Sequence, residues 1–160
     1  GRADLSIDSE RLEGYFHALQ NRHYGGQLLH AQEALTRTLN GVASALEQRL
    51  EQRAVCFNRR PTPDAHVLHT IFSRFYVGRA QPYLARVHRQ SQTYFELIDR
   101  LAETTDAPKI FVEYREAQLR PDAPRGHQAR FAAAIQRHTT TWQRLFDECG
   151  LSAAPLASAQ

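Results

Sequence analysis

Apolar residues recur at steps of three and four along most of the chain, the spacing that places side chains on one face of an α-helix. No segment shows the two-residue alternation of a strand followed by a hairpin turn. The pattern therefore predicts an all-α protein, built as an antiparallel bundle of four to five helices. We expect the bundle to occupy residues 1–150 and residues 151–160 to form a flexible tail or linker.

The first third of the chain predicts two helices. The first begins near residue 9 and is expected to stop at Gly25 and Gly26, because glycine is a weak helix former. The second is expected to continue to about residue 58, because one apolar row keeps its phase over that length. The row consists of Leu28, Leu35, Leu39, Val42, Leu46, Leu50, Ala54 and Phe57.

A long third helix is predicted to follow the Pro61–Asp64 turn. Thr62 is the expected N-cap, and Pro63 fits the first turn, where a missing N–H costs nothing. The first part of this helix has an apolar face broad enough to predict contacts on two sides. Gly78 and Pro82 predict a kink, since proline lacks one helical hydrogen bond and glycine is conformationally loose. Beyond the kink, a regular apolar seam predicts lengthwise packing.

Two helices are expected after residue 108: a short one, and a last one capped by Asp122 and stopped by Gly150. Polar residues interrupt the long seams at Ser91 in the third helix and at His138, one turn before Trp142, in the last. Because a buried imidazole needs a hydrogen-bond partner, we expect these helices to pack together so that His138 and Ser91 meet, or share water or ligand. The preferred interpretation of His138 by itself is a core histidine satisfied by its neighbours. In a pocket, such a histidine could respond to pH near neutrality.

Positive charge is concentrated in the middle of an otherwise balanced chain. Eight arginines and two acids lie between Arg49 and Gln90, whereas both flanks hold slightly more acids than bases and the net charge is only +3. Such a cluster attracts anionic groups over roughly 8–10 Å. We expect an arginine-rich zone made by the end of the second helix, the following turn and a stripe of the third. Its candidate binding residues are Arg53, Arg59, Arg60, Arg79, Arg86 and Arg89.

Sequence frameworks for catalysis are missing. The eight glycines form no phosphate-binding loop and no H-E-x-x-H is present, so we expect no cofactor and favour binding over catalysis. His66 and His69 could approach one metal ion, but helical geometry places both outside the apolar face or at its edge, and no metal site is expected. Cys56 and Cys149 are expected to be reduced thiols, because they lack metal-ligand spacing and disulfides are rare in the cytoplasm.

The leading hypothesis is a helical binding or regulatory module that recognises an acidic protein surface or an anionic small ligand through the arginine-rich zone. One alternative is a metal- or ligand-dependent enzyme or sensor centred on His138, or on His66 and His69. Another is the excised ligand-binding domain of a larger bacterial receptor or regulator. Nucleic acid is a less favoured partner, because the net charge is small. No apolar run approaches the ~18 residues of a membrane span. The expected protein is soluble and cytoplasmic, or periplasmic if a signal or anchor was removed.

Overall fold

The computed structural model describes residues 13–15, 17, 23–52 and 54–152 of the 160-residue chain. Within these residues the chain forms helices and no strand, which confirms the all-α prediction. In chain order the elements are α2 (Tyr24–Gln52), α3 (Pro63–Ile71), the π-helical segment η1 (Phe72–Ala80), α4 (Gln81–Thr104), α5 (Lys109–Tyr114), the π-helical segment η2 (Arg115–Leu119) and α6 (His127–Glu148). Most of the predicted first helix lies outside the described residues. No helix in the described part is both long and apolar enough to cross a membrane.

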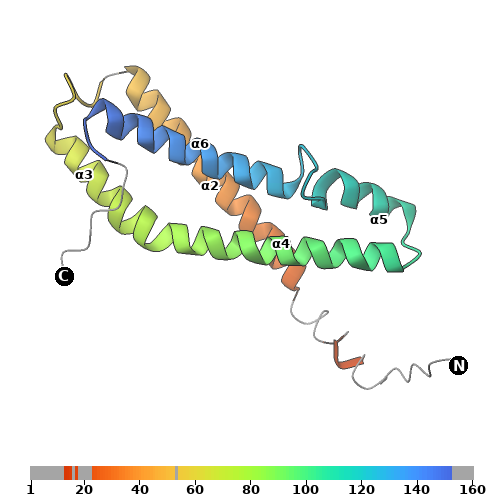
Figure 1. Ribbon diagram of the computed structural model, residues 1–160. Coiled ribbons are helices and arrows are strands. Elements are labelled where there is room, and N and C mark those ends of the chain that lie inside the picture. Colours follow the sequence, from red (N-terminus) through yellow and green to blue (C-terminus); the bar gives the residue numbers. More distant parts are fainter. Residues whose placement is uncertain (1–12, 16, 18–22, 53, 153–160) are drawn as a thin grey trace, which may run out of the picture.

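The chain crosses the bundle three times (Figure 1). α2 runs in one direction, the continuous α3–η1–α4 helix runs back, and α5, η2 and α6 return. Consecutive passes are therefore antiparallel, as predicted, whereas α2 and α6 run parallel to each other. Ion pairs between these two helices follow the same order on both, from Glu33 with Arg130 to Glu47 with Arg137.

Gly25 and Gly26 lie in the first turn of α2, so the prediction that they stop a helix is wrong. A Cβ atom at Gly25 would stand 2.1 Å from the hydroxyl oxygen of Tyr94. Gly25 therefore lets the ring of Tyr94, on α4, approach the backbone of α2. This packing contact, which lies far away in the sequence, explains the glycine better than helix termination does.

The predicted kink in the third helix takes the form of η1. Thr62 caps α3 as expected, with its hydroxyl accepting from the N–H of Ala65 at 3.3 Å. At the other end of η1, the N–H of Gln81 donates to the carbonyl of Tyr76, five residues back. The helix stays continuous across this segment while its direction changes (Figure 1). π-helical hydrogen bonds thus accommodate Gly78 and Pro82 without a break.

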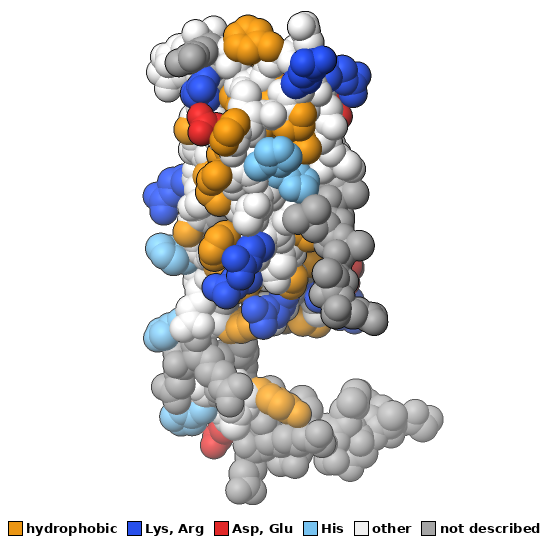
Figure 2. All heavy atoms as spheres, turned by 90° about the vertical axis from the view of Figure 1, so that its left-hand side faces the viewer, with side chains coloured by type: hydrophobic (Ala, Val, Ile, Leu, Met, Phe, Trp, Pro, Cys, Tyr) orange, Lys and Arg blue, Asp and Glu red, His pale blue; other side chains and the backbone are white. Residues whose placement is uncertain are grey.

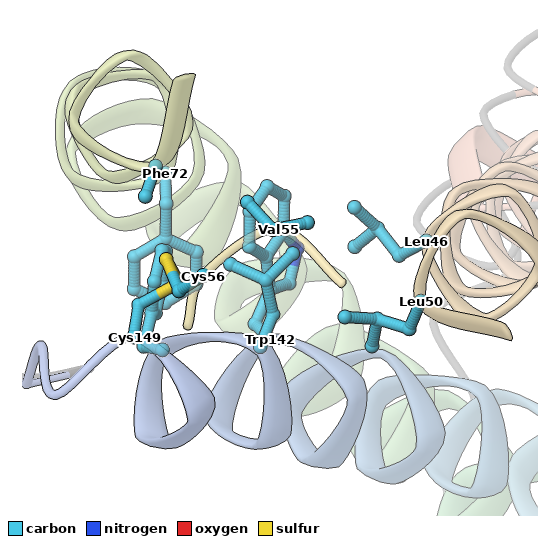
Figure 3. Packing of buried hydrophobic residues seen from close by; sticks show 10 residues of the cluster. Leu46, Leu50, Val55, Cys56, Phe72, Trp142 and Cys149 are labelled. Atoms are coloured by element: carbon cyan, nitrogen blue, oxygen red, sulfur yellow. A yellow bond between two sulfur atoms is a disulfide. The ribbon is translucent and has the colours of Figure 1, made fainter. Parts of the chain in front are cut away.

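Two hydrophobic clusters hold the three passes together. In the cluster beside the 54–62 loop, the ring centroid of Phe72 lies 5.2 Å from those of both Trp142 and Phe146 (Figure 3). The second cluster, at mid-bundle, joins Leu84 of α4 to Phe131 of α6. Full burial of one such side chain contributes about 1.5–3 kcal/mol, so these contacts position η1 against α6.

Cys56 and Cys149 form a disulfide, so the expectation of two reduced thiols is wrong. Their Cα atoms are 5.0 Å apart although 93 residues separate them in the sequence. α2 ends at Gln52, not near residue 58, and the chain then turns through left-handed backbone at Asn58 and Arg59. This turn returns the loop over the end of α6 and brings the two sulfur atoms into the aromatic cluster (Figure 3). No local spacing in the sequence indicates that return.

The C-terminal helix ends as predicted but begins differently. Gly150 has a φ of 66°, and the N–H of Leu151 donates to the carbonyl of Phe146 at 2.8 Å, a standard glycine stop. Gly126, not Asp122, precedes the first turn, because α6 begins at His127, and the carboxylate of Asp122 accepts from Arg120 instead. Residues 153–160 of the predicted tail lie outside the described residues.

Candidate binding site between α2 and η1

A hollow of about 280 Å³ lies between α2 and the α3–η1–α4 helix, with α6 also contributing to its wall. We call it the α2–η1 pocket. Its lining is almost entirely apolar or aromatic, as in most ligand sites. The contributors include Leu35, Leu39 and Val42 from α2, Ile71 from α3, Phe72, Phe75 and Tyr76 from η1, Tyr83 and Leu84 from α4, and His138 and Trp142 from α6.

Several large apolar side chains at this pocket remain in contact with solvent. Phe75 is 52% exposed, Ile71 44%, Tyr83 41% and Val42 37%. Exposed apolar groups gathered around a hollow are typical of an interaction site, whereas single exposed ones are not. The broad apolar face of the third helix was visible in the sequence. What the sequence did not indicate is that one of its two sides stays uncovered by the described part of the chain.

Two arginines of the predicted zone lie over rings that line the pocket. The guanidinium carbon of Arg79 is 5.5 Å from the centroid of Phe75, and that of Arg86 is 5.3 Å from the centroid of Tyr83. Both are cation–π distances. Neither arginine forms an ion pair with any acid in the part of the chain that the structure describes. Neither guanidinium is therefore neutralised by an acid of the described residues.

The remaining arginines of the zone do not gather at the pocket. Arg59 and Arg60 lie exposed in the loop at the end of the bundle, and Arg53 lies outside the described residues. Arg89 lines a different, larger hollow of about 690 Å³ beside the start of α2. Figure 2, which views the loop end, shows basic side chains in several separate places among hydrophobic and histidine side chains. Tertiary structure thus divides the charge that the sequence presents as one cluster.

His138 and Trp142 form a bonded pair in the wall of the pocket. Trp142 Nε1 donates to His138 Nε2 at 3.1 Å, so the imidazole proton sits on Nδ1, which has no partner among the described residues. Only 3% of His138 is exposed, and its ring centroid is 4.4 Å from that of Tyr76. Desolvation lowers the pKa of His138 to about 4. The imidazole is therefore neutral at pH 7, and a pKa of about 4 lies outside the near-neutral range in which a pocket histidine could have responded.

Ser91 and His138 do not meet through a hydrogen bond. The hydroxyl of Ser91 donates to the carbonyl of Val87 in its own helix at 2.8 Å. Both side chains are buried, as their places in the apolar seams predicted. They lie at different positions along the bundle: His138 packs on Tyr76 of η1, whereas Ser91 follows Tyr76 by 15 residues, about four helical turns.

His66 and His69 occupy different environments. His66 is exposed, as expected, but His69 is buried, which corrects the prediction that both histidines avoid the core. The Nε2 atom of His69 lies 2.9 Å from the carbonyl oxygen of Ser152, and its ring packs edge-on against Phe146. The prediction considered only the apolar face of the helix that carries His69, and this histidine is buried by contacts with Phe146 and Ser152. Across the described residues, no group of three or more His, Cys, Asp or Glu side chains converges as metal ligands would.

Comparison with known proteins places the chain by family alone. Neither a curated protein nor a solved structure matches it. One family model does match, over residues 2–153, and its description is a protein of unknown function, DUF3080. Since the match covers nearly the whole sequence, this chain belongs to the DUF3080 family.

Proposed function

We propose that this chain is a helical binding module that receives an anionic partner at the α2–η1 pocket. The apolar part of the partner contacts the pocket, and its anionic group is held by Arg79 and Arg86. The observation that carries the proposal is the position of these two guanidinium groups on the rings of Phe75 and Tyr83, with no acidic partner in the described chain.

Stacking on a ring leaves the in-plane N–H groups of arginine available. A guanidinium held in this way can donate two parallel hydrogen bonds to a carboxylate or phosphate. Charge of this kind mainly increases the rate of encounter and fixes orientation, while aromatic and aliphatic anchors supply most of the affinity. Both components occur together at this pocket, and that coincidence favours it over the isolated Arg59 and Arg60.

His138 fits a role in recognition better than one in proton transfer. Its Nε2 atom already accepts from Trp142, and its low pKa makes it a weak base. The Nδ1–H group is a buried donor without a partner among the described residues, which is costly in an apolar environment. A ligand oxygen that reached Nδ1 would supply the missing acceptor.

The test uses 1-anilinonaphthalene-8-sulfonate, a fluorescent probe that combines an aromatic body with one anionic group. We expect it to bind the folded protein, and the Arg79→Glu/Arg86→Glu variant to weaken binding at least about fivefold, roughly 1 kcal/mol. Arg100→Glu/Arg125→Glu is the matched control, because it makes the same charge change at exposed positions outside the pocket lining. Equal weakening in both variants, at unchanged circular dichroism, would reject the pocket and leave only non-specific attraction.

We also propose that the chain matures in an oxidising compartment such as the bacterial periplasm, rather than in the cytoplasm. The support is the buried Cys56–Cys149 disulfide, since persistent disulfides form mainly outside the reducing cytoplasm. Protein isolated from its native cells under acid quench should resist alkylation by a maleimide until it is denatured and reduced. Alkylation of both cysteines after denaturation without a reductant would contradict this proposal.

A further inference from the structure

The α2–η1 pocket continues toward the 54–62 loop. A second hollow of about 330 Å³ lies between the same two helices, lined in part by Leu46 of α2 and by Val67 and Leu68 of α3. On both helices this lining begins about one turn from that of the first pocket, because Leu46 follows Val42 and Val67 precedes Ile71 by four residues each. The two hollows therefore follow one another along the same pair of helices, and we call them together the furrow.

The length of the furrow matches that of a short helix. Its α2 wall extends from Leu35 to Arg49, which corresponds to roughly 20 Å, or about 14 helical residues. Its other wall presents Val67, Ile71 and Phe75 at intervals of four, and these side chains are 58%, 44% and 52% exposed. Such a row forms a ridge of the kind that packs against a neighbouring helix.

The charged residues around the furrow favour an acidic partner. Arg74, Arg79 and Arg86 are exposed on the α3–η1–α4 side, and Asp64 is the acid that lines the second hollow. An amphipathic helix with acidic flanks would meet these guanidinium groups favourably. A second copy of this chain, packed furrow to furrow, would instead bring the same arginines together.

We infer that the furrow is the docking site for an amphipathic, acidic helix of a partner protein. This inference rests on the proposed function and specifies the partner. The helix lies between α2 and the α3–η1 ridge, where it occupies the place of a further bundle helix. Two of its apolar side chains, four or seven residues apart, enter the two hollows. The anchor in the α2–η1 pocket packs beside His138, and acidic side chains pair with Arg79 and Arg86.

A displayed peptide library tests the inference and needs no identified partner. Its members have about 16 residues, with leucine fixed at helical three- and four-residue spacing and every other position randomised. Selection on the intact, oxidised protein should enrich Asp and Glu at the flanking positions. Enrichment of Lys and Arg, or of sequences with central proline, would overturn the inference, because such peptides cannot be acidic helices.

The most enriched peptide is then measured by fluorescence anisotropy. Val67→Asp should weaken binding of the peptide about tenfold or more. Binding of the anionic fluorophore should stay unchanged, since Val67 lines the second hollow and not the α2–η1 pocket. Leu97→Asp is the matched control, an exposed leucine on α4 outside the furrow. Unchanged peptide binding to Val67→Asp would overturn the furrow even where the fluorophore still supports the pocket. Sedimentation of the wild type and of Val67→Asp tests the remaining occupant. If the wild type self-associates and the variant does not, the furrow binds a second copy of this chain and the inference is overturned.

Discussion

Arg137 and Arg79 have the same side chain and different surroundings. Arg137, on α6, donates to Glu47 at 3.1 Å through Nε and also reaches Asn40 and Ser44, so one guanidinium joins α6 to three residues of α2. Arg79, on η1, lies on the ring of Phe75 and has no acidic partner within the described part of the chain. Exposure does not separate the two roles, because the Arg137 side chain is itself 40% exposed. The difference lies in the acidic partner: Arg137 has one and joins two helices, whereas Arg79 has none within the described residues.

The contrast extends to the other arginines. Five arginines that form ion pairs within the described residues lie in the last third of the chain: Arg115, Arg120, Arg130, Arg137 and Arg144. Between Arg49 and Gln90 two acids accompany eight arginines, so these arginines have few acidic neighbours in the sequence. Unequal local composition thus leaves cationic groups available without a large net charge.

The largest effect is expected from removing the disulfide at the end of the bundle, beside the cluster that positions η1. Cys56→Ser/Cys149→Ser should lower the free energy of unfolding by about 4 kcal/mol, because a disulfide closing a loop of 93 residues strongly restricts the unfolded chain. Fluorophore binding at the pocket should also weaken, since the disulfide packs in the same cluster as Phe72, which lines the pocket. Urea denaturation and probe titration measure the two effects. Equal stability of the oxidised wild type and the variant would contradict the prediction.

Acid should destabilise the two regions in different pH ranges. The folded pKa of His138 is about 4, below the ordinary value of 6.5, so the unfolded state binds the proton more readily. Stability from this group is full above pH 6.5 and falls by up to about 3 kcal/mol as the pH approaches 4. His138→Gln, which keeps an acceptor for Trp142, should flatten this part of a stability–pH profile. A profile identical to that of the wild type would show that the imidazole is not desolvated.

Glu47 acts at lower pH. The hydrogen bond from Arg137 lowers the pKa of this carboxyl below its ordinary value of 4.5. Its contribution is therefore present above pH 4.5 and is lost as the pH falls through the folded pKa. Glu47→Gln should remove this loss and leave the His138 region of the profile unchanged.

The smallest expected effect is a difference in Tm between variants of the paired and the unpaired arginines. Arg137→Met should lower the Tm, because Glu47 then loses its main donor. Arg79→Met/Arg86→Met should leave the Tm nearly unchanged, since methionine still covers the rings of Phe75 and Tyr83. Thermal unfolding by circular dichroism checks both variants at one pH and ionic strength. A larger fall in Tm for the double variant would assign Arg79 and Arg86 a structural role instead.

Local signals in the sequence predicted local features correctly. Thr62 and Pro63 begin α3, Gly150 ends the last helix, and Gly78 with Pro82 coincide with the change of direction around η1. Each of these depends on hydrogen bonds and dihedral angles within a few residues. The seams likewise predicted that Ser91 and His138 are buried.

Several errors concern residues whose surroundings come from distant parts of the chain. Phe57 was predicted to belong to a buried seam and is 68% exposed, because α2 ends before it and the loop turns away. His69 was predicted to avoid the core, but the segment around Ser152 covers it. Cys56 was predicted to be a free thiol, and only the returning loop brings it to Cys149.

The sequence by itself determined an all-α fold, the start of α3, the stop of the last helix at Gly150 and a cationic segment at residues 49–90, because periodicity, capping and composition act over short distances. Only the tertiary structure decided which arginines are paired, where the apolar face stays open and which cysteines and histidines find partners. Helical side chains three or four positions apart share a face whatever the rest of the chain does. The contact between Arg137 and Glu47, or between Arg86 and the pocket, exists only after the three passes of the bundle pack together.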